Sequence, residues 1–264
     1  MLVNIVGLGK VSLSIAKQLK DKIQFGYLVS RDFEKAMLVA KELNATPVTY
    51  NDNFKLKGIV LFGLNDSVLP KAKNLLFSKT EDIVAIHFSG FHPSTVFPFD
   101  WSPATMHPNC AVASDSALFK DVIFGLEGTE KGVIIAQKIV ELLEGKYVII
   151  PTDKKMIYHL AAVISSNFSI GLAYISSILY KEIGIEDEIS EKIISQLLKT
   201  VSENIEKLGI SNALTGPIKR GDWDVVRNER SVFLDFVRKK NICCETLYDD
   251  FVKLLSTILE IKEE

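Results

Sequence analysis

Two polar side chains that could act on a substrate lie on one apolar segment of the chain. Offsets of seven and eight residues return to nearly the same face of an α-helix after two turns, so His159 can point the same way as Asn167, with Ser166 beside it. An unperturbed imidazole titrates near neutral pH and can give or take a proton. We expect His159 and Asn167 to be catalytic and Ser166 to bind substrate. The alternative is that His159 is a hydrogen-bonded core histidine and that Asn167 braces a neighbouring turn.

Two further histidines stand at the ends of short apolar runs that are typical of β-strands. His87 belongs to Ile83–Phe88, and His107 ends Ala104–His107. We expect His107 to give or take a proton and His87 to contact the substrate. Either ring could instead hydrogen-bond the backbone of a neighbouring loop. Polar residues also follow the predicted strands, and we expect two of them to contact a cofactor, Asn65 and Ser89, and one to contact the substrate, Asn109.

The linker between two predicted helices, residues 210–220, has an unusual composition. Gly216 before proline forces a turn, Thr215 offers a hydroxyl, and Lys219 and Arg220 offer positive charge. A loop of this kind can bind an anionic substrate or hold the same loop of a second protomer, and we expect these four residues to bind substrate. The alternative is a structural turn whose lysine and arginine are solvated.

The elements that must position these residues begin at the N-terminus with a strand, a glycine turn and a helix. The apolar run Leu2–Val6 is followed by Gly7 and Gly9, and helical spacing then resumes. Such a turn presents free backbone N–H groups and a positive dipole end to a pyrophosphate. The third small position of this pattern is Ser12, still small enough for the helix to pack on the strand. We expect the turn to bind the cofactor through Gly7, Leu8, Gly9, Lys10 and Val11.

The end of the second predicted strand, Phe25–Val29, should contact the cofactor's ribose. Ser30 and Arg31 stand where an NAD site normally has an acidic residue, and a hydroxyl with a guanidinium suits a 2′-phosphate. A charge-assisted hydrogen bond contributes roughly 1.5–3 kcal/mol. We interpret Asp32 as the N-cap of the next helix, Phe33–Leu43. This arrangement favours NADP(H); a strand end one residue later would favour NAD(H).

Strands and helices alternate through residue 150, which predicts an α/β fold with a doubly wound, mainly parallel sheet. After Pro151 almost everything is helical, so we expect a dinucleotide-binding domain at 1–150 and an all-helical substrate and dimerisation domain at 151–264. The helices are predicted from Asp153 to Ile183, from a Ser190 cap to Gly209, from Asp222 to about Lys239, and from Thr246 to about Ile261.

Composition excludes several classes of partner. The chain has 264 residues, with 31 Lys and Arg against 33 Asp and Glu, so a net charge of −2 does not favour nucleic acid. The 3 cysteines lack metal-ligand spacing, and we expect reduced thiols in a cytoplasm and no metal. The N-terminus lacks the features of a signal peptide.

One long segment could be mistaken for a membrane span. Residues 156–180 contain no Asp, Glu, Lys or Arg, but they include His159, Asn167 and several serines. We expect this segment to be a helix buried on all sides within a helical domain or a homodimer, with no membrane partner.

Several motifs together resemble one family: GLGKVS, SRD after the second strand, HFSG at 87–90, HPN at 107–109, YHLAAVISSNF at 158–168 and ALTGPIKRGD at 213–222. The chain is similar to bacterial Rossmann-like proteins with a C-terminal helical domain of unknown function, described as candidate NADP-dependent oxidoreductases. The resemblance implies relatives in pyrroline-5-carboxylate reductase and 6-phosphogluconate dehydrogenase-like enzymes, and a dimer built on the helical domains. His159 then falls where related dehydrogenases have a lysine, and Asn167 where they have an asparagine.

These observations support two hypotheses about function. The first is an oxidoreductase that transfers a hydride between NADP(H) and a small, perhaps anionic, carbonyl or imine compound held between the two domains. The second is a non-catalytic NADP(H)-binding redox sensor or regulatory protein, since a fold does not fix a function.

Overall fold

The computed structural model describes residues 1–260. These residues form two compact units, Met1–Ser169 and a second unit that begins at Ile170. Strands give way to helices after residue 150, where we placed the domain boundary. The first unit nevertheless extends to Ser169, because the helix that follows residue 150 is bonded to the sheet through Lys155 and Tyr158.

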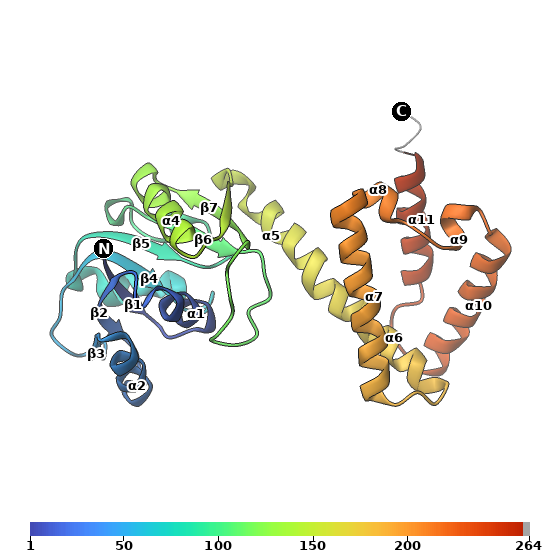
Figure 1. Cartoon of the computed structure of the whole chain (residues 1–264), viewed down its shortest axis with the longest axis horizontal. Helices are drawn as coiled ribbons and strands as arrows, with labels where there is room; N and C mark the ends of the chain where they lie inside the picture. Colours follow the sequence, from blue (N-terminus) through green and yellow to red (C-terminus); the bar gives the residue numbers. More distant parts are fainter. Residues whose placement is uncertain (261–264) are drawn as a thin grey trace. The chain divides into compact units, whose positions relative to one another are not determined.

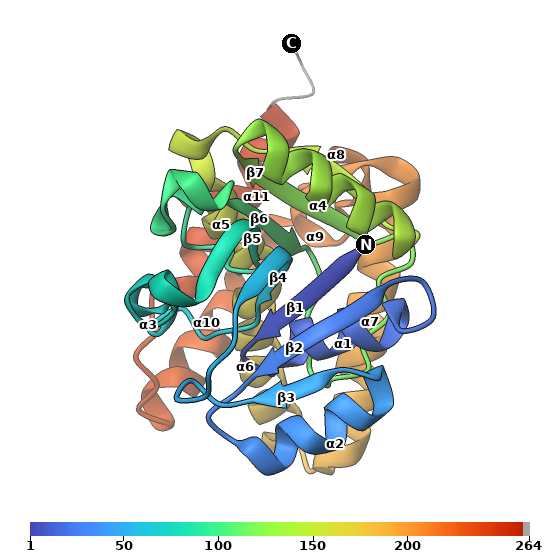
Figure 2. The ribbon, with the colours of Figure 1, turned by 90° about the vertical axis from the view of Figure 1, so that its left-hand side faces the viewer.

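The first unit contains one eight-stranded sheet in the order β3-β2-β1-β4-β5-β6-β7-β8 (Figures 1 and 2). All neighbouring strands are parallel except the antiparallel pair β6 and β7. The first six strands have the order of a doubly wound dinucleotide-binding sheet, which confirms the predicted fold class. The strands are β1 (Leu2–Val6), β2 (Gln24–Val29), β3 (Thr46–Val48), β4 (Leu56–Phe62), β5 (Thr80–His87), β6 (Ala104–Pro108), β7 (Ile123–Gly128) and β8 (Lys146–Ile149).

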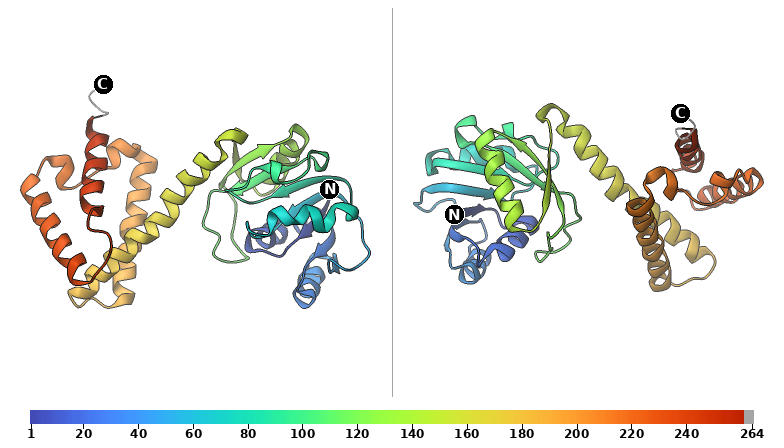
Figure 3. Two further views of the ribbon diagram at one scale, coloured as in Figure 1. Left: turned by 180° about the vertical axis from the view of Figure 1, so that it is seen from behind. Right: turned by 45° about the horizontal axis from the view of Figure 1, so that its top comes forward.

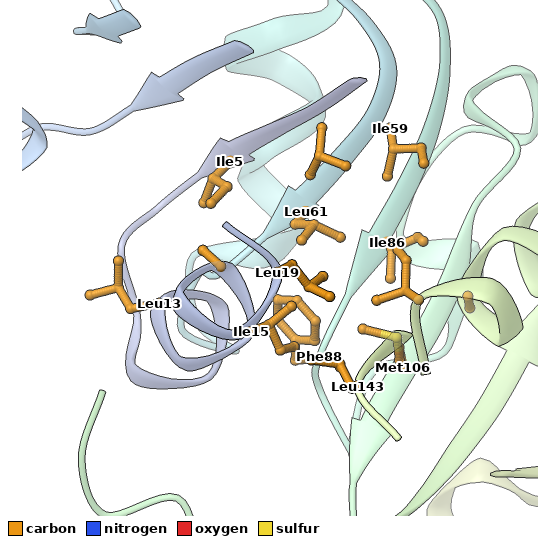
Figure 4. Packing of buried hydrophobic residues seen from close by; sticks show 14 of the residues in the cluster. Ile5, Leu13, Ile15, Leu19, Ile59, Leu61, Ile86, Phe88, Met106 and Leu143 are labelled. Atoms are coloured by element: carbon orange, nitrogen blue, oxygen red, sulfur yellow. The ribbon is translucent and has the colours of Figure 1, made fainter. Parts of the chain in front are cut away.

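Helices cover both faces of this sheet. On one face α1 (Lys10–Leu19), α2 (Phe33–Leu43) and α4 (Glu130–Leu142) share one buried apolar cluster with the strands. On the other face a second cluster contains Leu69, the short helix α3 (Ala72–Leu76) and Trp101. Figure 4 shows how the α1 side chains Ile15 and Leu19 lie among Leu61, Ile86, Phe88 and Met106.

A nearly continuous helical run leaves the sheet and crosses into the second unit. It comprises α5 (Lys155–Val163), a π-helical segment (Ile164–Phe168) and α6 (Ser169–Glu182). Part of the span Thr152–Glu182 is long and apolar enough to cross a membrane, and none of that stretch is buried within the single chain. The single chain therefore does not bury this helix on all sides: Ile175, Ile178 and Leu179 of α6 pack partly against the core of the second unit, and burial in a homodimer stays a prediction.

The second unit is helical (Figures 1 and 3). A small core forms where Phe233, Phe236 and Val237 pack against apolar residues of α6 and α11. The predicted Ser190 cap is wrong: α7 starts at Asp187, and the Ser190 hydroxyl donates to the Asp187 carbonyl inside the first turn. The predicted end of the last helix near Ile261 lies outside the described residues. Besides α6, the helices are α7 (Asp187–Leu208), α8 (Ile210–Ala213), α9 (Pro217–Arg220), α10 (Trp223–Lys239) and α11 (Leu247–Glu260).

Candidate functional site

The glycine turn lies at the carboxyl end of β1, as the sequence predicts. Gly7 has φ of +83°, and Gly9 is the N-cap of α1, where no side chain caps the helix. A Cβ atom would lie 2.8 Å from the Gly63 carbonyl oxygen at Gly7 and 2.7 Å from it at Gly9. Only glycine therefore lets this turn pack on the end of β4. The helix start is left without a side chain over its first N–H groups, an arrangement that suits a phosphate.

Ser12 takes the third small position of the motif and is fully buried. Its hydroxyl lies 3.1 Å from the Gly7 carbonyl oxygen and 2.9 Å from the Gly9 carbonyl oxygen, to which it donates. The side chain thus ties the first helix turn to the glycine turn. Serine at this position therefore adds a hydrogen bond that the usual glycine or alanine could not make.

The end of β2 brings cationic groups close to this turn. Asp32 caps α2 by accepting from the Lys35 backbone N–H at 3.0 Å, which confirms our interpretation of it as an N-cap. Lys35 Nζ donates to the Leu8 carbonyl oxygen at 3.1 Å, which places this cation at the glycine turn, and Arg31 is exposed just after β2. We did not identify Lys35 from the sequence; its position one helical turn after the Asp32 cap was the available signal. Ser30 is buried, and its hydroxyl oxygen accepts from the Asp32 N–H.

The two other expected cofactor residues lie at later strand ends. Asn65 is exposed just beyond β4. Its backbone carbonyl oxygen accepts from the backbone N–H groups of Val68 and Leu69. Ser89 follows β5, and its hydroxyl oxygen accepts from the N–H groups of Phe91 and His92. Ser89 therefore shapes the loop after β5.

The first unit brings three expected site residues together at the end of β6. His107 Nδ1 lies 2.8 Å from the Tyr158 hydroxyl oxygen, and that hydroxyl donates to Asn109 Oδ1 at 3.0 Å. His159 is next to Tyr158 on α5, with its ring centroid 6.3 Å from that of His107. Tyr158 was missed from the sequence, although it belongs to the same helical motif as His159.

The imidazole rings of His107 and His159 both lie next to Gly90. A Cβ atom there would lie 2.6 Å from His159 Nδ1 and 2.8 Å from His107 Nε2. His159 Nδ1 is buried and has no hydrogen-bond partner in the described part of the chain. A buried polar atom without a partner is costly in a folded protein, and such groups often face a ligand.

Burial and neighbouring charge keep His107 neutral. Burial, together with the positive charge of Lys155 and the nearby His159 ring, lowers the pKa of His107 to about 4. Asp66 opposes the shift. His107 is therefore an uncharged imidazole at neutral pH, able to accept a hydrogen bond on one nitrogen and donate one from the other.

A buried lysine and a buried glutamate support the same region. Lys155 Nζ donates to the Thr105 hydroxyl at 2.8 Å. Burial lowers the pKa of Lys155 to about 8, although the negative charge of Glu127 acts to raise it. Glu127 accepts hydrogen bonds from Ser94 and from the Thr152 hydroxyl. These residues connect β6, β7, the loop after β5 and the start of the α5 segment. The sequence did not single them out, since lone charges gave no local pattern.

His87 is not placed for a ligand. Its side chain is fully buried, with Nε2 3.3 Å from the Pro93 carbonyl oxygen and Nδ1 accepting from the Ser89 N–H. Burial, reinforced by the positive charge of Lys155, lowers its pKa to about 3. The expectation that His87 contacts substrate does not fit these contacts, because the ring points into the core and holds the loop after β5.

The π-helical segment affects the alignment of His159 with Asn167. A π turn takes up about one residue more than an α turn. Asn167, eight residues after His159, therefore lies close to the position that the seventh residue would have in an uninterrupted α-helix. Asn167 is exposed, and the Ser166 hydroxyl bonds both the Ala162 carbonyl oxygen at 2.6 Å and Asn167 Oδ1 at 2.9 Å.

The four expected residues of the 210–220 linker all lie in the second unit. Gly216 has φ of +87° at the turn before α9, and Thr215 is exposed. Lys219 Nζ donates to the Asn212 carbonyl oxygen at 3.3 Å, and Arg220 Nε lies 2.8 Å from Asp222 Oδ2. Both cations thus have partners within their own loop. Across residues 1–260 no cluster of three His, Cys, Asp or Glu side chains is arranged to hold a metal ion.

Comparison with known proteins identifies the family. Residues 122–252 match the domain of unknown function DUF2520. The solved structure of protein TM1727 from Thermotoga maritima is 36% identical, with 99% of this chain and 100% of that chain covered and a TM-score of 0.81. The chain belongs to the DUF2520 family. No curated protein gives a match.

More distant solved structures share the fold of this DUF2520 protein. BF3122 from Bacteroides fragilis, named as a candidate NADP oxidoreductase, is 20% identical over 97% of this chain and 98% of its own, with a TM-score of 0.73. A 1-pyrroline-5-carboxylate reductase from Streptococcus pyogenes is 15% identical over 97% and 98%, with a TM-score of 0.65.

The DUF2520 match begins at β7 and includes the helical side of the histidine cluster. Glu127, Lys155, Tyr158 and His159 lie inside the matched range, whereas the glycine turn precedes it. The matched range therefore includes part of the candidate site and most of the helical unit that the structure describes.

Proposed function

We propose that the protein is an NADP(H)-dependent oxidoreductase acting on a small carbonyl or imine compound. The observation that carries this proposal is the glycine turn, whose glycines cannot be replaced without collision and whose helix start has no side-chain cap. Arg31 and Lys35 are the cations available for a ribose 2′-phosphate, and Ser30 adds a hydroxyl. The fold neighbours BF3122 and the pyrroline-5-carboxylate reductase, by their names, agree with such chemistry.

The bound nicotinamide would supply a hydride to the substrate carbon or accept one from it. The chain's own part is to hold the substrate and handle a proton. His107 and His159 are the candidate proton-handling groups, and Asn167 and Ser166 are candidates for orienting the substrate. We propose Thr215, Gly216, Lys219 and Arg220 as further substrate-binding residues, as the sequence indicates.

Calorimetric titration with NADPH, NADP⁺ and NADH tests cofactor binding first. We expect NADPH to bind, and no heat with any dinucleotide contradicts the proposal. Oxidation of NADPH is then measured with imines, keto acids and aldehydes. His159→Ala and Asn167→Ala should abolish turnover while leaving NADPH affinity unchanged. Binding without any turnover across the panel favours the redox sensor instead.

We also propose that a second copy of the chain completes the helical unit. Its fully or nearly fully buried hydrophobic residues are only Val226, Phe233, Phe236 and Val237 among those described, a small core for a unit of this length. Meanwhile α6 exposes Ile170 at 69% of its surface, and other large apolar side chains of α6 and α7 are also exposed. An identical chain is always available to bury such faces, and symmetric dimers are the commonest assembly.

A further inference from the structure

We propose that Asn109 and Tyr158 fix the tautomer of His107, placing its proton on Nδ1 and leaving the Nε2 lone pair to accept a hydrogen bond from the substrate. This inference rests on the proposed function for the presence of a substrate, but the tautomer itself can be measured without one. The substrate group that meets Nε2 is then a hydroxyl, an amine or a protonated imine, rather than a bare carbonyl oxygen.

The direction of the hydrogen-bond chain starts at Asn109. Its Nδ2 donates to the Ile123 carbonyl oxygen at 3.0 Å, and its backbone N–H donates to the same oxygen at 3.1 Å. The opposite orientation of the amide would place Oδ1 against that carbonyl oxygen, two acceptors facing each other. The Asn109 Oδ1 atom is therefore the one that faces Tyr158.

Tyr158 has one proton, and Asn109 receives it. The hydroxyl donates to Oδ1 at 3.0 Å, and burial raises the pKa of Tyr158, so the phenol keeps this proton. The Tyr158 oxygen can then only accept from His107, whose Nδ1 lies 2.8 Å away. Gly125 on β7 makes room for this arrangement, since a Cβ atom there would lie 2.3 Å from the Tyr158 oxygen.

The proton on Nδ1 leaves His107 Nε2 as an acceptor. The ring is neutral, and Nε2 makes no hydrogen bond within residues 1–260. It converges with the unpartnered His159 Nδ1 beside Gly90, where no side chain intervenes. A hydroxyl group satisfies both nitrogens, donating to His107 and accepting from a His159 Nδ1–H.

The chemistry that follows balances for a hydroxyl substrate. The O–H bond breaks with its proton moving to His107 Nε2, and the C–H bond breaks with its hydride, and both electrons, passing to NADP⁺, so that a C=O bond forms. In the direction of reduction, a protonated imine offers the same N–H donor to Nε2. Asn109 and Tyr158 are positioning residues in this scheme, acting through His107.

Nitrogen NMR of ¹⁵N-histidine-labelled full-length protein, without dinucleotide, tests the tautomer. The His107 signals are assigned by their loss in His107→Gln. We expect the wild-type ring to carry its proton on Nδ1 at pH 7. Tyr158→Phe removes the acceptor and should shift His107 toward the Nε2–H form, and Asn109→Leu should do the same in part. Tyr147→Phe, at an exposed tyrosine on β8, is the matched control and should change nothing.

A wild-type ring protonated on Nε2, or a tautomer unchanged in Tyr158→Phe, overturns the proposal even if NADPH binds.

The substrate class is tested by titrating the same sample, saturated with NADP⁺, with 2-propanol and with acetone, which differ by the donating hydrogen. We expect 2-propanol to shift the His107 Nε2 resonance and acetone to leave it in place. An equal shift with both, or none with 2-propanol, contradicts the assignment of Nε2 as acceptor. Absence of NADP⁺ binding contradicts the proposed function alone.

Discussion

Both carboxylate oxygens of Glu127 accept a hydrogen bond from Ser94: Oε2 from its backbone N–H at 2.8 Å, and Oε1 from its hydroxyl at 2.6 Å. Oε1 also accepts from the Thr152 hydroxyl at 3.0 Å. Glu127, on β7, thus binds both the loop after β5 and the segment that leads into α5. The positions of Gly90 and His159 depend on those two segments, so Glu127 is a structural support of the histidine cluster.

Glu127→Gln should destabilise the protein, because the new NH₂ group faces donors instead of accepting from them. Losing a buried charge-assisted hydrogen bond and leaving a donor unpaired costs roughly 2–4 kcal/mol of unfolding free energy. Urea unfolding measures this change. Glu42→Gln, at an exposed position of α2, is the matched control and should change stability by less than about 0.5 kcal/mol. Equal stability of both variants contradicts the role of Glu127.

Acid should destabilise the protein through His87. The pKa of His87 is about 3 in the folded chain, against 6.5 for an ordinary histidine. Above pH 6.5 the ring is neutral in both states; between pH 6.5 and 3 only the unfolded chain takes up the proton, so stability falls as the pH falls. The full effect is on the order of 5 kcal/mol. His87→Gln keeps a donor and an acceptor and should flatten the pH dependence of urea unfolding over this range; an unchanged slope contradicts the prediction.

Local patterns in the sequence were sufficient for the parts of the site that depend on neighbouring residues. The glycine turn and the Asp32 cap were predicted correctly because strand, turn and helix signals lie within a few residues of one another. His87 and His107 were indistinguishable, since both end apolar runs. The structure separates them: the loop after β5 encloses the His87 ring, whereas the His107 ring is bonded to Tyr158 on α5.

The residues that were missed depend on contacts between distant parts of the chain. Lys155 bonds Thr105, 50 positions away, and Glu127 on β7 bonds Ser94 in the loop after β5. Neither pairing leaves a local pattern. The apolar composition of α6 indicates that the helix is covered but not whether its own chain or a second copy covers it, and the single chain leaves much of it exposed.

Gly9→Ala should disrupt the dinucleotide turn. Its Cβ would lie 2.7 Å from the Gly63 carbonyl oxygen, a backbone atom that cannot move aside. We expect a loss of about 1–3 kcal/mol in unfolding free energy and loss of NADPH binding in calorimetry. Lys138→Ala, at an exposed position of α4, is the control and should change the unfolding free energy by less than about 0.5 kcal/mol and leave NADPH binding intact. NADPH binding retained by Gly9→Ala contradicts the assignment of the turn.

Arg31→Ala tests the choice between NADPH and NADH. If Arg31 faces the 2′-phosphate, the variant should bind NADPH about tenfold or more weakly and leave NADH affinity unchanged. Lys35→Ala should weaken both cofactors, because Lys35 is bonded to the glycine turn itself through the Leu8 carbonyl oxygen. Calorimetry with each cofactor measures these affinities. Equal weakening of NADPH and NADH by Arg31→Ala shows that the guanidinium does not face the phosphate.

The oligomeric state tests whether a second copy covers the helical unit. In light scattering coupled to gel filtration, the wild type should have twice the chain mass of 29.4 kDa. Combining Ile170→Glu with Tyr174→Glu places charge on exposed apolar positions of α6 and should give monomers with lower stability. Combining Lys192→Gln with Lys199→Gln lowers the net charge equally at exposed positions of α7 and should leave the dimer intact. A monomeric wild type, or one that requires detergent to stay in solution, contradicts the dimer, since burial against an identical chain needs no lipid.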